Sequence, residues 1–251
     1  MRRLFYDIET SPDVVLAWRT GWKEKIDYQN LLKERAIICI AYKWEGSKDT
    51  EVLTWDKNQC DKAMLQKFSK VLSGADECVG HNIDKFDWPW IKTRCLFHSI
   101  TLPPIKTADT LQWSRRYYYF NSNRLDYIAT FLGIGCKVKT EFKLWKEVLL
   151  NKSQKSLDTM KRYCAWDVVL LEKVWEKLQI LCPVKTHAGV LNGHEKWSCP
   201  RCASDKVLKW QRHVTAAGTE QYKMKCRECG GYYRISNTAL KQYNERNKEA
   251  A

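Results

Sequence analysis

Four carboxylates placed inside apolar runs constrain the fold of this chain more than any other feature of its sequence. They are Asp7, Glu9, Asp87 and Asp167. Their apolar neighbours predict burial, and an ionised carboxylate is costly to bury without a compensating charge. The fold must therefore bring cations to these side chains. Carboxylate oxygens are hard ligands that favour Mg²⁺ or Mn²⁺, so the sequence predicts a site for such ions.

The composition indicates a globular protein with a polyanionic partner. Hydrophobic residues make up 44% of the 251 residues and aromatic residues 12%, which excludes a disordered chain. The length is sufficient for one domain of ordinary size and a small module. Lys and Arg total 43 against 29 Asp and Glu, and the formal net charge of +14 favours nucleic acid as the partner. A basic surface that serves only solubility is the alternative.

The 11 cysteines do not form the framework of a secreted disulfide protein. Four of them lie in two Cys-x-x-Cys pairs, and the others are scattered singly. The first residues contain no apolar stretch of signal-peptide length, and no window approaches the length of a membrane span. We therefore expect a cytoplasmic protein that has no membrane partner.

Hydrophobic patterns predict a series of strands and helices. Strands are expected at residues 3–10, 36–44, 51–55 and 78–80. Helices are expected at residues 64–72, from Asp87 onward, at 124–132 and at 155–179. Asn123 is positioned to cap the third of these helices, and Gly133 follows it. The first three strands suggest an antiparallel meander, and the order of elements fits a mixed α/β sheet with helices on its faces.

The spacing of the acidic residues within these elements places them on common faces. Asp7 and Glu9 are two residues apart, so both side chains point to the same face of a strand. Tyr163 and Asp167 are four residues apart and lie one above the other on a helix. Each feature has an ordinary alternative: an exposed strand face, a half-exposed helical Asp, or Asp87 as a helix N-cap. The three features together, in suitable elements, favour one shared site.

Three motifs that contain these residues resemble those of the DEDD superfamily of 3′-to-5′ exonucleases. The motifs are Asp7-Ile8-Glu9, Asn82-x-x-x-Phe86-Asp87 followed by Trp88-Pro89, and Tyr163-x-x-x-Asp167. The second has the form seen in the proofreading domains of family-B DNA polymerases, and the third is the tyrosine variant, called DEDDy. The resemblance covers roughly residues 1–180. It implies an RNase H-like α/β fold, with a mixed five-stranded sheet flanked by helices.

Chemistry and the resemblance together give each acidic residue an expected role. Asp7 would bridge two Mg²⁺ or Mn²⁺ ions. Glu9 and Asp167 would complete the site that activates water, and Asp87 would anchor the second ion. Tyr163 would orient the water, because its own pKa of about 10 is too high for an efficient base.

Two further residues of the second motif are expected to bind the substrate. Asn82 and Phe86 would contact the terminal nucleotide, Phe86 by stacking on the base. A core position is equally compatible with an aromatic residue such as Phe86. Asp84 lies close to Asp87 but misses the motif position, so we assign it no role.

The implied activity is exonucleolytic hydrolysis of DNA from a 3′ end, with release of nucleoside 5′-monophosphates. The resemblance makes single-stranded DNA ends the expected substrate and replication proofreading the expected context, with a polymerase or another replication protein as partner. An exoribonuclease that trims RNA 3′ ends is an alternative, since the same metal site accepts either sugar. A non-catalytic binding scaffold is another, although the complete acidic set argues against it.

Four cysteines late in the sequence predict a zinc site. They are Cys199, Cys202, Cys226 and Cys229, arranged as Cys-x2-Cys, 23 intervening residues and Cys-x2-Cys. Four thiolates with this spacing suit one structural Zn²⁺, and the strand-like residues around them suggest a zinc ribbon. A pair of redox dithiols is the alternative. We expect an exonuclease domain at residues 1–182, a linker at 183–194, and a zinc ribbon with a polar C-terminal tail at 195–251.

Basic and aromatic residues occur together in the predicted ribbon and in one further segment. The last 71 residues carry 13 Lys and Arg against 6 Asp and Glu. Cations beside aromatic residues such as Trp210 and Tyr232 suit a single strand with stacked bases, and docking of another protein is the alternative. The run at residues 113–120 combines two arginines with aromatic residues. It is compatible with a substrate channel or with a buried loop.

Overall fold

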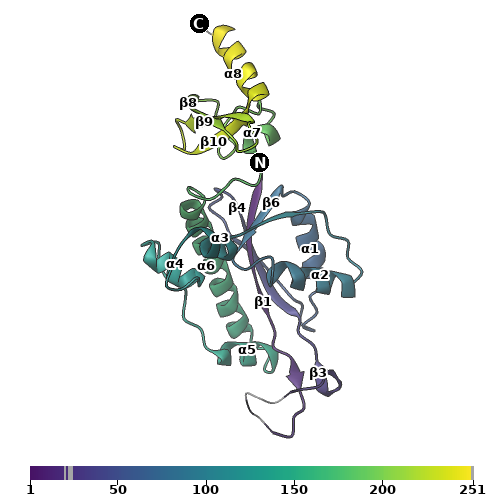
Figure 1. Cartoon of the computed structure of the whole chain (residues 1–251). Coiled ribbons are helices and arrows are strands. Elements are labelled where there is room, and N and C mark those ends of the chain that lie inside the picture. Colours follow the sequence, from purple (N-terminus) through teal and green to yellow (C-terminus); the bar gives the residue numbers. More distant parts are fainter. Residues whose placement is uncertain (20, 22–24, 250–251) are drawn as a thin grey trace. The chain divides into compact units, whose positions relative to one another are not determined.

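The computed structural model describes residues 1–19, 21 and 25–249. The chain forms two compact units (Figure 1). One unit is Arg2–Leu178, and the other is Gln179–Ala251 together with Met1. The carboxylate motifs all lie in the first unit and the four paired cysteines in the second.

A five-stranded mixed sheet forms the centre of the first unit, in the order β5-β4-β1-β6-β7. The strands are β1 (Arg3–Thr10), β4 (Ile37–Trp44), β5 (Glu51–Thr54), β6 (Glu77–Gly80) and β7 (Lys106–Asp109). The first three form the predicted antiparallel meander, while β6 and β7 continue the sheet in parallel. The predicted mixed α/β class is confirmed. The sequence patterns missed β7, because this short edge strand is largely polar and alternates only weakly.

Successive residues of β1 contact opposite layers of the molecule. The ring of Tyr6 packs 5.2 Å from that of Phe68 on α1 (Lys62–Leu72), on the side that also carries α2 (Asp87–Phe97). The ring of Phe5 packs 5.4 Å from that of Trp175 on α6 (Gln154–Leu178). Figure 1 shows β1 between these helical layers. Side chains alternate along a strand, so Asp7 and Glu9 share the α6 face with Phe5.

Three shorter helices precede α6, namely α3 (Thr110–Tyr117), α4 (Leu125–Phe131) and α5 (Phe142–Leu149). The first contains most of the aromatic run at 113–120, so the buried-loop interpretation of that run is wrong for its first half. The prediction that Asn123 caps the next helix is also wrong. Arg124 is the N-cap residue and makes no side-chain cap hydrogen bond. The backbone oxygen of Asn123 instead lies 2.9 Å from Nε2 of His81.

A small two-stranded ribbon follows β1, and no pattern in the sequence predicted it. It pairs β2 (Val14–Val15) with β3 (Leu31–Lys33), and the 3-10 helix η1 (Tyr28–Asn30) precedes β3. These strands are two and three residues long, too short for periodicity to register.

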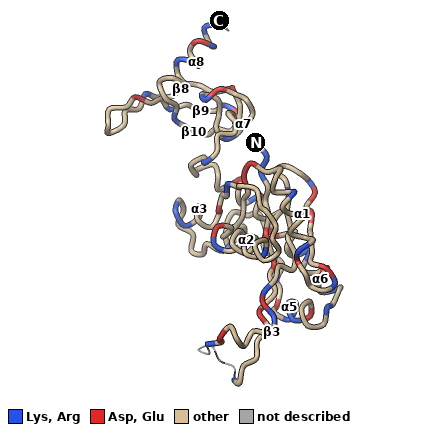
Figure 2. Tube along the Cα trace, turned by 90° about the vertical axis from the view of Figure 1, so that its right-hand side faces the viewer, with Lys and Arg blue, Asp and Glu red and all other residues tan. Residues whose placement is uncertain are grey.

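The second unit contains a three-stranded antiparallel sheet in the order β10-β9-β8. Its elements are α7 (Ala188–Leu191), β8 (Val207–Val214), β9 (Glu220–Cys226), β10 (Tyr232–Ser236) and α8 (Asn237–Glu249). Trp197, Met224 and Ile235 belong to its small buried core. The short helix α7 lies within the predicted linker. Figure 2 shows that Lys and Arg residues are distributed along both units. None of the helices in the described ranges has the length and apolarity needed to cross a membrane.

Candidate active site

Three carboxylates from two distant parts of the chain converge on one side of the sheet. One oxygen each from Asp7, Glu9 and Asp167 lies within 4.8 Å of the others. Asp7 and Glu9 come from β1 and are partly exposed, while Asp167 projects from α6 and is buried. The two-residue spacing on the strand and the packing of α6 across the sheet produce this meeting.

Asp87 approaches the same strand from the first turn of α2. Its Oδ1 accepts a hydrogen bond of 3.2 Å from the backbone N–H of Ile8, the residue between Asp7 and Glu9. The side chain is buried. The N-cap position belongs to Phe86, so Asp87 is the first helical residue and its carboxyl is available to β1. The second motif therefore places its carboxylate against the first.

Burial and mutual repulsion make these carboxyl groups hard to ionise. Burial, followed by the negative charge of Asp167, raises the pKa of Asp7 to about 7. Burial and the charge of Asp7 raise the pKa values of Glu9 and Asp87 well above their usual range. Burial also raises the pKa of Asp167, although Lys137 opposes this effect. A cation bound among these groups would relieve the same repulsion by displacing protons.

Lys137 is the basic residue at the site, and sequence reasoning missed it. Its Nζ donates a hydrogen bond of 2.6 Å to Oδ2 of Asp167 and lies 5.7 Å from the ring centroid of Tyr163. The residue lies between α4 and α5, in a segment with no helical or strand period. Cys164 was also missed. Its Sγ donates to the backbone oxygen of Asp7 at 3.5 Å, and so ties α6 to β1.

The donor set fits divalent cations with oxygen ligands. Oδ1 of Asp167 is buried and has no hydrogen-bond partner in the described part of the chain, although Lys137 occupies Oδ2. A buried carboxylate oxygen without a donor is costly, and a metal ion is one partner that satisfies it. Asp7 and Glu9 each bring one oxygen to within 4.8 Å of an oxygen of Asp167. These three residues, with Asp87 beside them, are the ones that could hold Mg²⁺ or Mn²⁺.

Tyr163 lies one helical turn before Asp167 and packs edge-on to Trp145 of α5, with 6.4 Å between ring centroids. Burial, together with the negative charges of Asp167 and Glu9, raises the pKa of Tyr163 well above its usual value. The phenol is therefore neutral at physiological pH. It can donate a hydrogen bond but cannot serve as a base.

The loop that carries Asn82 and Phe86 is held by the next strand and helix. Asn82 has a left-handed backbone, with φ of 74°, and its N–H donates to Oδ1 of Asp109 at 2.9 Å. The same oxygen accepts from the N–H of Leu111, so Asp109 caps α3 as well. Phe86 is partly buried and packs against the core cluster beneath α1 and α2. No pattern in the sequence gave Asp109 a role, because β7, which this residue ends, was not predicted.

The four paired cysteines meet in the second unit. One sulfur from each of Cys199, Cys202, Cys226 and Cys229 lies within 4.8 Å of the others. The Sγ–Sγ distance is 3.6 Å both for Cys199 with Cys229 and for Cys202 with Cys226. A cluster of four thiols in a unit with a three-stranded sheet is compatible with a zinc ribbon.

A family model described as the RNase H superfamily matches residues 29–179, which extend from η1 to just beyond the end of α6. The chain belongs to the RNase H superfamily. The matched range includes Asp87, Tyr163 and Asp167 and begins after Asp7 and Glu9. Membership in the RNase H superfamily supports a nuclease-type function, and RNase H-like nucleases use divalent metals.

Among solved structures, this RNase H superfamily member is similar to the family B DNA polymerase from the hyperthermophilic archaeon Pyrobaculum calidifontis. The TM-score is 0.54 and the sequence identity 18%, over 71% of this chain and 24% of the polymerase chain. The chain thus spans about a quarter of the polymerase's length. At such identity the similarity shows the fold alone. No curated protein matches the chain.

Proposed function

We propose that this protein is a metal-dependent 3′-to-5′ exonuclease of the DEDDy type that hydrolyses the phosphodiester bonds of DNA. The observation that carries the proposal is the approach of oxygens from Asp7, Glu9 and Asp167 to within 4.8 Å of one another. Asp87 supports it by binding the strand between the first two residues. The nuclease-type superfamily and the likeness in fold to a DNA polymerase are consistent with it.

In this proposal the carboxylates hold the cations, and Tyr163 orients the water. Two divalent cations, when bound, would supply an activated water and stabilise the entering and leaving oxygens of the displaced phosphoryl group. Asp7, Glu9 and Asp167 would hold them, with Asp87 as the further ligand on the α2 side. The neutral hydroxyl of Tyr163 would donate a hydrogen bond that orients the attacking water. The products would be a nucleoside 5′-monophosphate and a shortened strand.

Asn82 and Phe86 would position the terminal nucleotide. Both lie on the loop before α2, so they reach the substrate from the same side as Asp87. The half-buried ring of Phe86 would offer its exposed part for stacking on the last base. In this proposal the substrate is a single-stranded DNA 3′ end. The context is replication proofreading, with a polymerase or another replication protein as partner.

The second unit would be a zinc ribbon in which Cys199, Cys202, Cys226 and Cys229 hold one structural Zn²⁺. The cluster of four sulfurs and the three-stranded sheet support this assignment. The domain boundaries that we propose are an exonuclease domain at 1–182, a linker at 183–194 and the ribbon at 195–251.

Digestion of matched DNA and RNA oligonucleotides tests the proposed function. Each oligonucleotide is labelled at one end or the other and incubated with Mg²⁺ and the parent protein, Asp7→Asn or Asp167→Asn. We expect the parent to shorten DNA from the 3′ end, and each variant to lose activity by roughly 10³-fold or more. Asp49→Asn, in the exposed turn between β4 and β5, is the matched control and should retain full activity.

The outcomes separate the alternatives. Faster digestion of RNA would assign the protein to RNA 3′-end trimming. Equal activity of Asp7→Asn and the parent would remove the carboxylate cluster from the chemistry. Absence of digestion by the parent on every substrate would favour a binding scaffold.

A further inference from the structure

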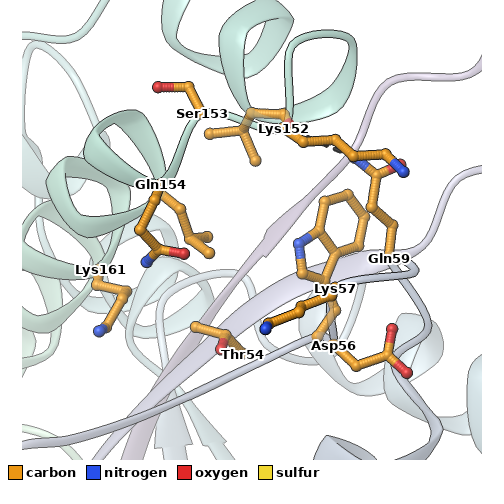
Figure 3. A pocket seen from close by; sticks show the side chains of 11 residues that line it. Thr54, Asp56, Lys57, Gln59, Lys152, Ser153, Gln154 and Lys161 are labelled. Carbon is orange, nitrogen blue, oxygen red and sulfur yellow. Dashed lines mark hydrogen bonds between the residues drawn. The ribbon is translucent and has the colours of Figure 1, made fainter.

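A cavity of about 590 Å³ lies between the end of β5 and the loop that joins α5 to α6. Its lining residues come from three segments that are far apart in the sequence: 54–59, the end of α5 with its loop at 148–153, and the start of α6 at 154–161. Figure 3 shows Lys57, Lys152 and Lys161 around the cavity, one from each segment. A volume of this size is in the range of small-molecule sites.

The cavity is distinct from the candidate active site. None of the four motif carboxylates lines it. Six residues separate Lys161, which lines the cavity, from Asp167 on the same helix, so the two side chains point roughly 120° apart around its axis. α6 therefore carries the carboxylate cluster on one face and the cavity on another.

The lining of the cavity carries more positive than negative charge, with three lysines and one aspartate. Lys57 and Lys152 are exposed and have no ion pair within the described ranges, while Lys161 has only a surface pair of 3.2 Å with Asp158. Such surface ion pairs contribute little to stability, so the pair leaves Lys161 free to bind a ligand. Asp56 is the one acidic lining residue, and its Oδ1 already accepts from the N–H groups of Asn58 and Cys60 at 2.8 and 2.9 Å.

A fourth lysine, Lys33, contacts two of the residues that line the cavity. Burial, followed by the charge of Lys152, lowers the pKa of Lys33. Nζ of Lys33 lies 5.6 Å from the ring centroid of Trp55 and donates a hydrogen bond to Oε1 of Gln59. Both Trp55 and Gln59 line the cavity.

The floor of the cavity is apolar and held in place. Trp55 is only 6% exposed, and Val148 and Leu157 also contribute to the lining. Nε2 of Gln59 donates to the backbone oxygens of Val148 and Leu149 at 3.2 and 2.8 Å. These hydrogen bonds join the lining segment 54–59 to the end of α5. A fixed apolar floor beneath several cations suits a ligand that combines a flat apolar group with phosphate.

We propose that this cavity is a second nucleotide-binding site, in which Lys57, Lys152 and Lys161 bind a phosphate group and the apolar floor receives the base or sugar. The phosphate belongs to a nucleotide unit within a nucleic-acid strand or to a free nucleoside monophosphate. Binding here requires no hydrolysis at the carboxylate cluster, so the proposal stands apart from the exonuclease function.

Binding measurements on the full chain test this site. The variant Lys57→Ala/Lys152→Ala removes two exposed cations, and Lys48→Ala/Lys70→Ala removes two exposed lysines elsewhere in the same unit as the charge-matched control. Both are prepared with Asp7→Asn, so that a strand is not consumed during the experiment. The probes are a labelled single-stranded oligothymidylate, followed by fluorescence anisotropy, and thymidine 5′-monophosphate, followed by calorimetry.

The cavity variant should bind at least one probe on the order of tenfold more weakly than the control does. Loss of the monophosphate alone identifies a site for free nucleotide, and loss of the oligonucleotide identifies a site on the strand's path. Lys57→Arg/Lys152→Arg should restore binding, because the charge returns. If the cavity variant and the control bind both probes equally, the proposal is overturned.

Discussion

The ionised form of Asp7 is destabilised by its surroundings in the folded protein. Its carboxyl lies on the central strand, within 4.8 Å of oxygens of Glu9 and Asp167. Within the described residues, its carboxyl oxygens accept a single weak hydrogen bond, from Sγ of Cys164 at 3.8 Å. A carboxyl so placed gains less from ionisation than it would in water, which is why its pKa rises to about 7.

The raised pKa of Asp7 predicts that the contribution of this carboxyl to the stability of the folded protein falls as the pH rises. The pKa of the carboxyl changes from 3.8 in the unfolded chain to about 7 in the folded protein. Between these values the folded state binds more protons, so stability is greatest below pH 4 and is lost as pH rises through 7. In the absence of Mg²⁺ and Mn²⁺, Asp7→Asn should be more stable than the parent at pH 8, by on the order of 2–4 kcal/mol.

Urea denaturation at a series of pH values measures this difference. The advantage of Asp7→Asn should shrink as the pH falls toward 4 and vanish at lower pH, where the parent's carboxyl is protonated in both states. Added Mn²⁺ should stabilise the parent more than the variant. Parallel curves for the two proteins from pH 4 to pH 8 would contradict the assignment of the raised pKa to Asp7.

Some residues of the site follow from the sequence, and others depend on contacts that leave no local signal. The common face of Asp7 and Glu9 follows from strand parity, and the stacking of Tyr163 above Asp167 follows from helical spacing. The pairing of Lys137 with Asp167 joins residues 30 positions apart and depends on the path of an aperiodic loop. No rule of spacing could have predicted it.

At the level of elements, the loop before α2 is positioned by a neighbour rather than by its own sequence. Asp109 ends β7 and accepts hydrogen bonds from the N–H groups of Asn82 and Leu111. One carboxylate thus caps α3 and fixes the loop that leads to Asp87. The long apolar strands and α6 were predictable from periodicity, but β7, α3 and α5 were missed. β7 is a short and largely polar edge strand, and each of the two helices is only eight residues long.

Asp109→Ala should therefore affect both stability and activity. It removes an N-cap and leaves partly buried N–H groups without their acceptor, at a cost of about 1–3 kcal/mol. Activity on DNA should fall more than unfolding alone explains, because the loop that carries Asn82 and Phe86 loosens, and KM should rise. Asp27→Ala, which removes the cap of the exposed helix η1, is the control and should leave KM unchanged. Thermal unfolding and steady-state kinetics check both, and an unchanged KM for Asp109→Ala would refute the positioning role.

The whole molecule combines a large α/β unit with a small unit whose core is slight. The buried core around Trp197 and Met224 contains few residues, and small domains of this kind commonly depend on a metal. If Zn²⁺ occupies the four sulfurs, its binding energy is part of the folding energy of the unit Gln179–Ala251. The two units should then differ in their response to chelation.

Cys226→Ser should release the zinc and unfold the second unit while the first stays folded. The purified parent should contain one zinc per chain, and the variant much less. Hydrogen exchange should show loss of protection in β8, β9 and β10 and unchanged protection in β1 and β4. Full zinc occupancy in the variant, or loss of protection throughout both units, would contradict the account.

An exposed aromatic pair on the second unit gives a further prediction. Trp210 and Tyr232 are 55% and 53% exposed, and Nζ of Lys225 lies 5.1 and 5.4 Å from their ring centroids. A cation beside exposed aromatic rings suits single-stranded nucleic acid, whose bases can stack on the rings. Trp210→Ala/Tyr232→Ala should weaken binding of a single-stranded oligonucleotide by roughly tenfold. Tyr28→Ala, an exposed aromatic of the other unit, should have no effect, and unchanged binding of the double variant would indicate a protein-docking surface.

Calorimetric titration of the zinc-loaded protein with Mn²⁺ measures whether the carboxylate cluster holds two divalent ions. We expect saturable binding of two ions to the parent and to Asp49→Asn, with loss of at least one ion in Asp7→Asn and in Asp167→Asn. Affinity should rise with pH toward 7, because the ions displace protons from the carboxyl groups. Absence of Mn²⁺ binding to the parent, or binding to Asp7→Asn that matches the parent, would contradict a two-ion site at the carboxylate cluster.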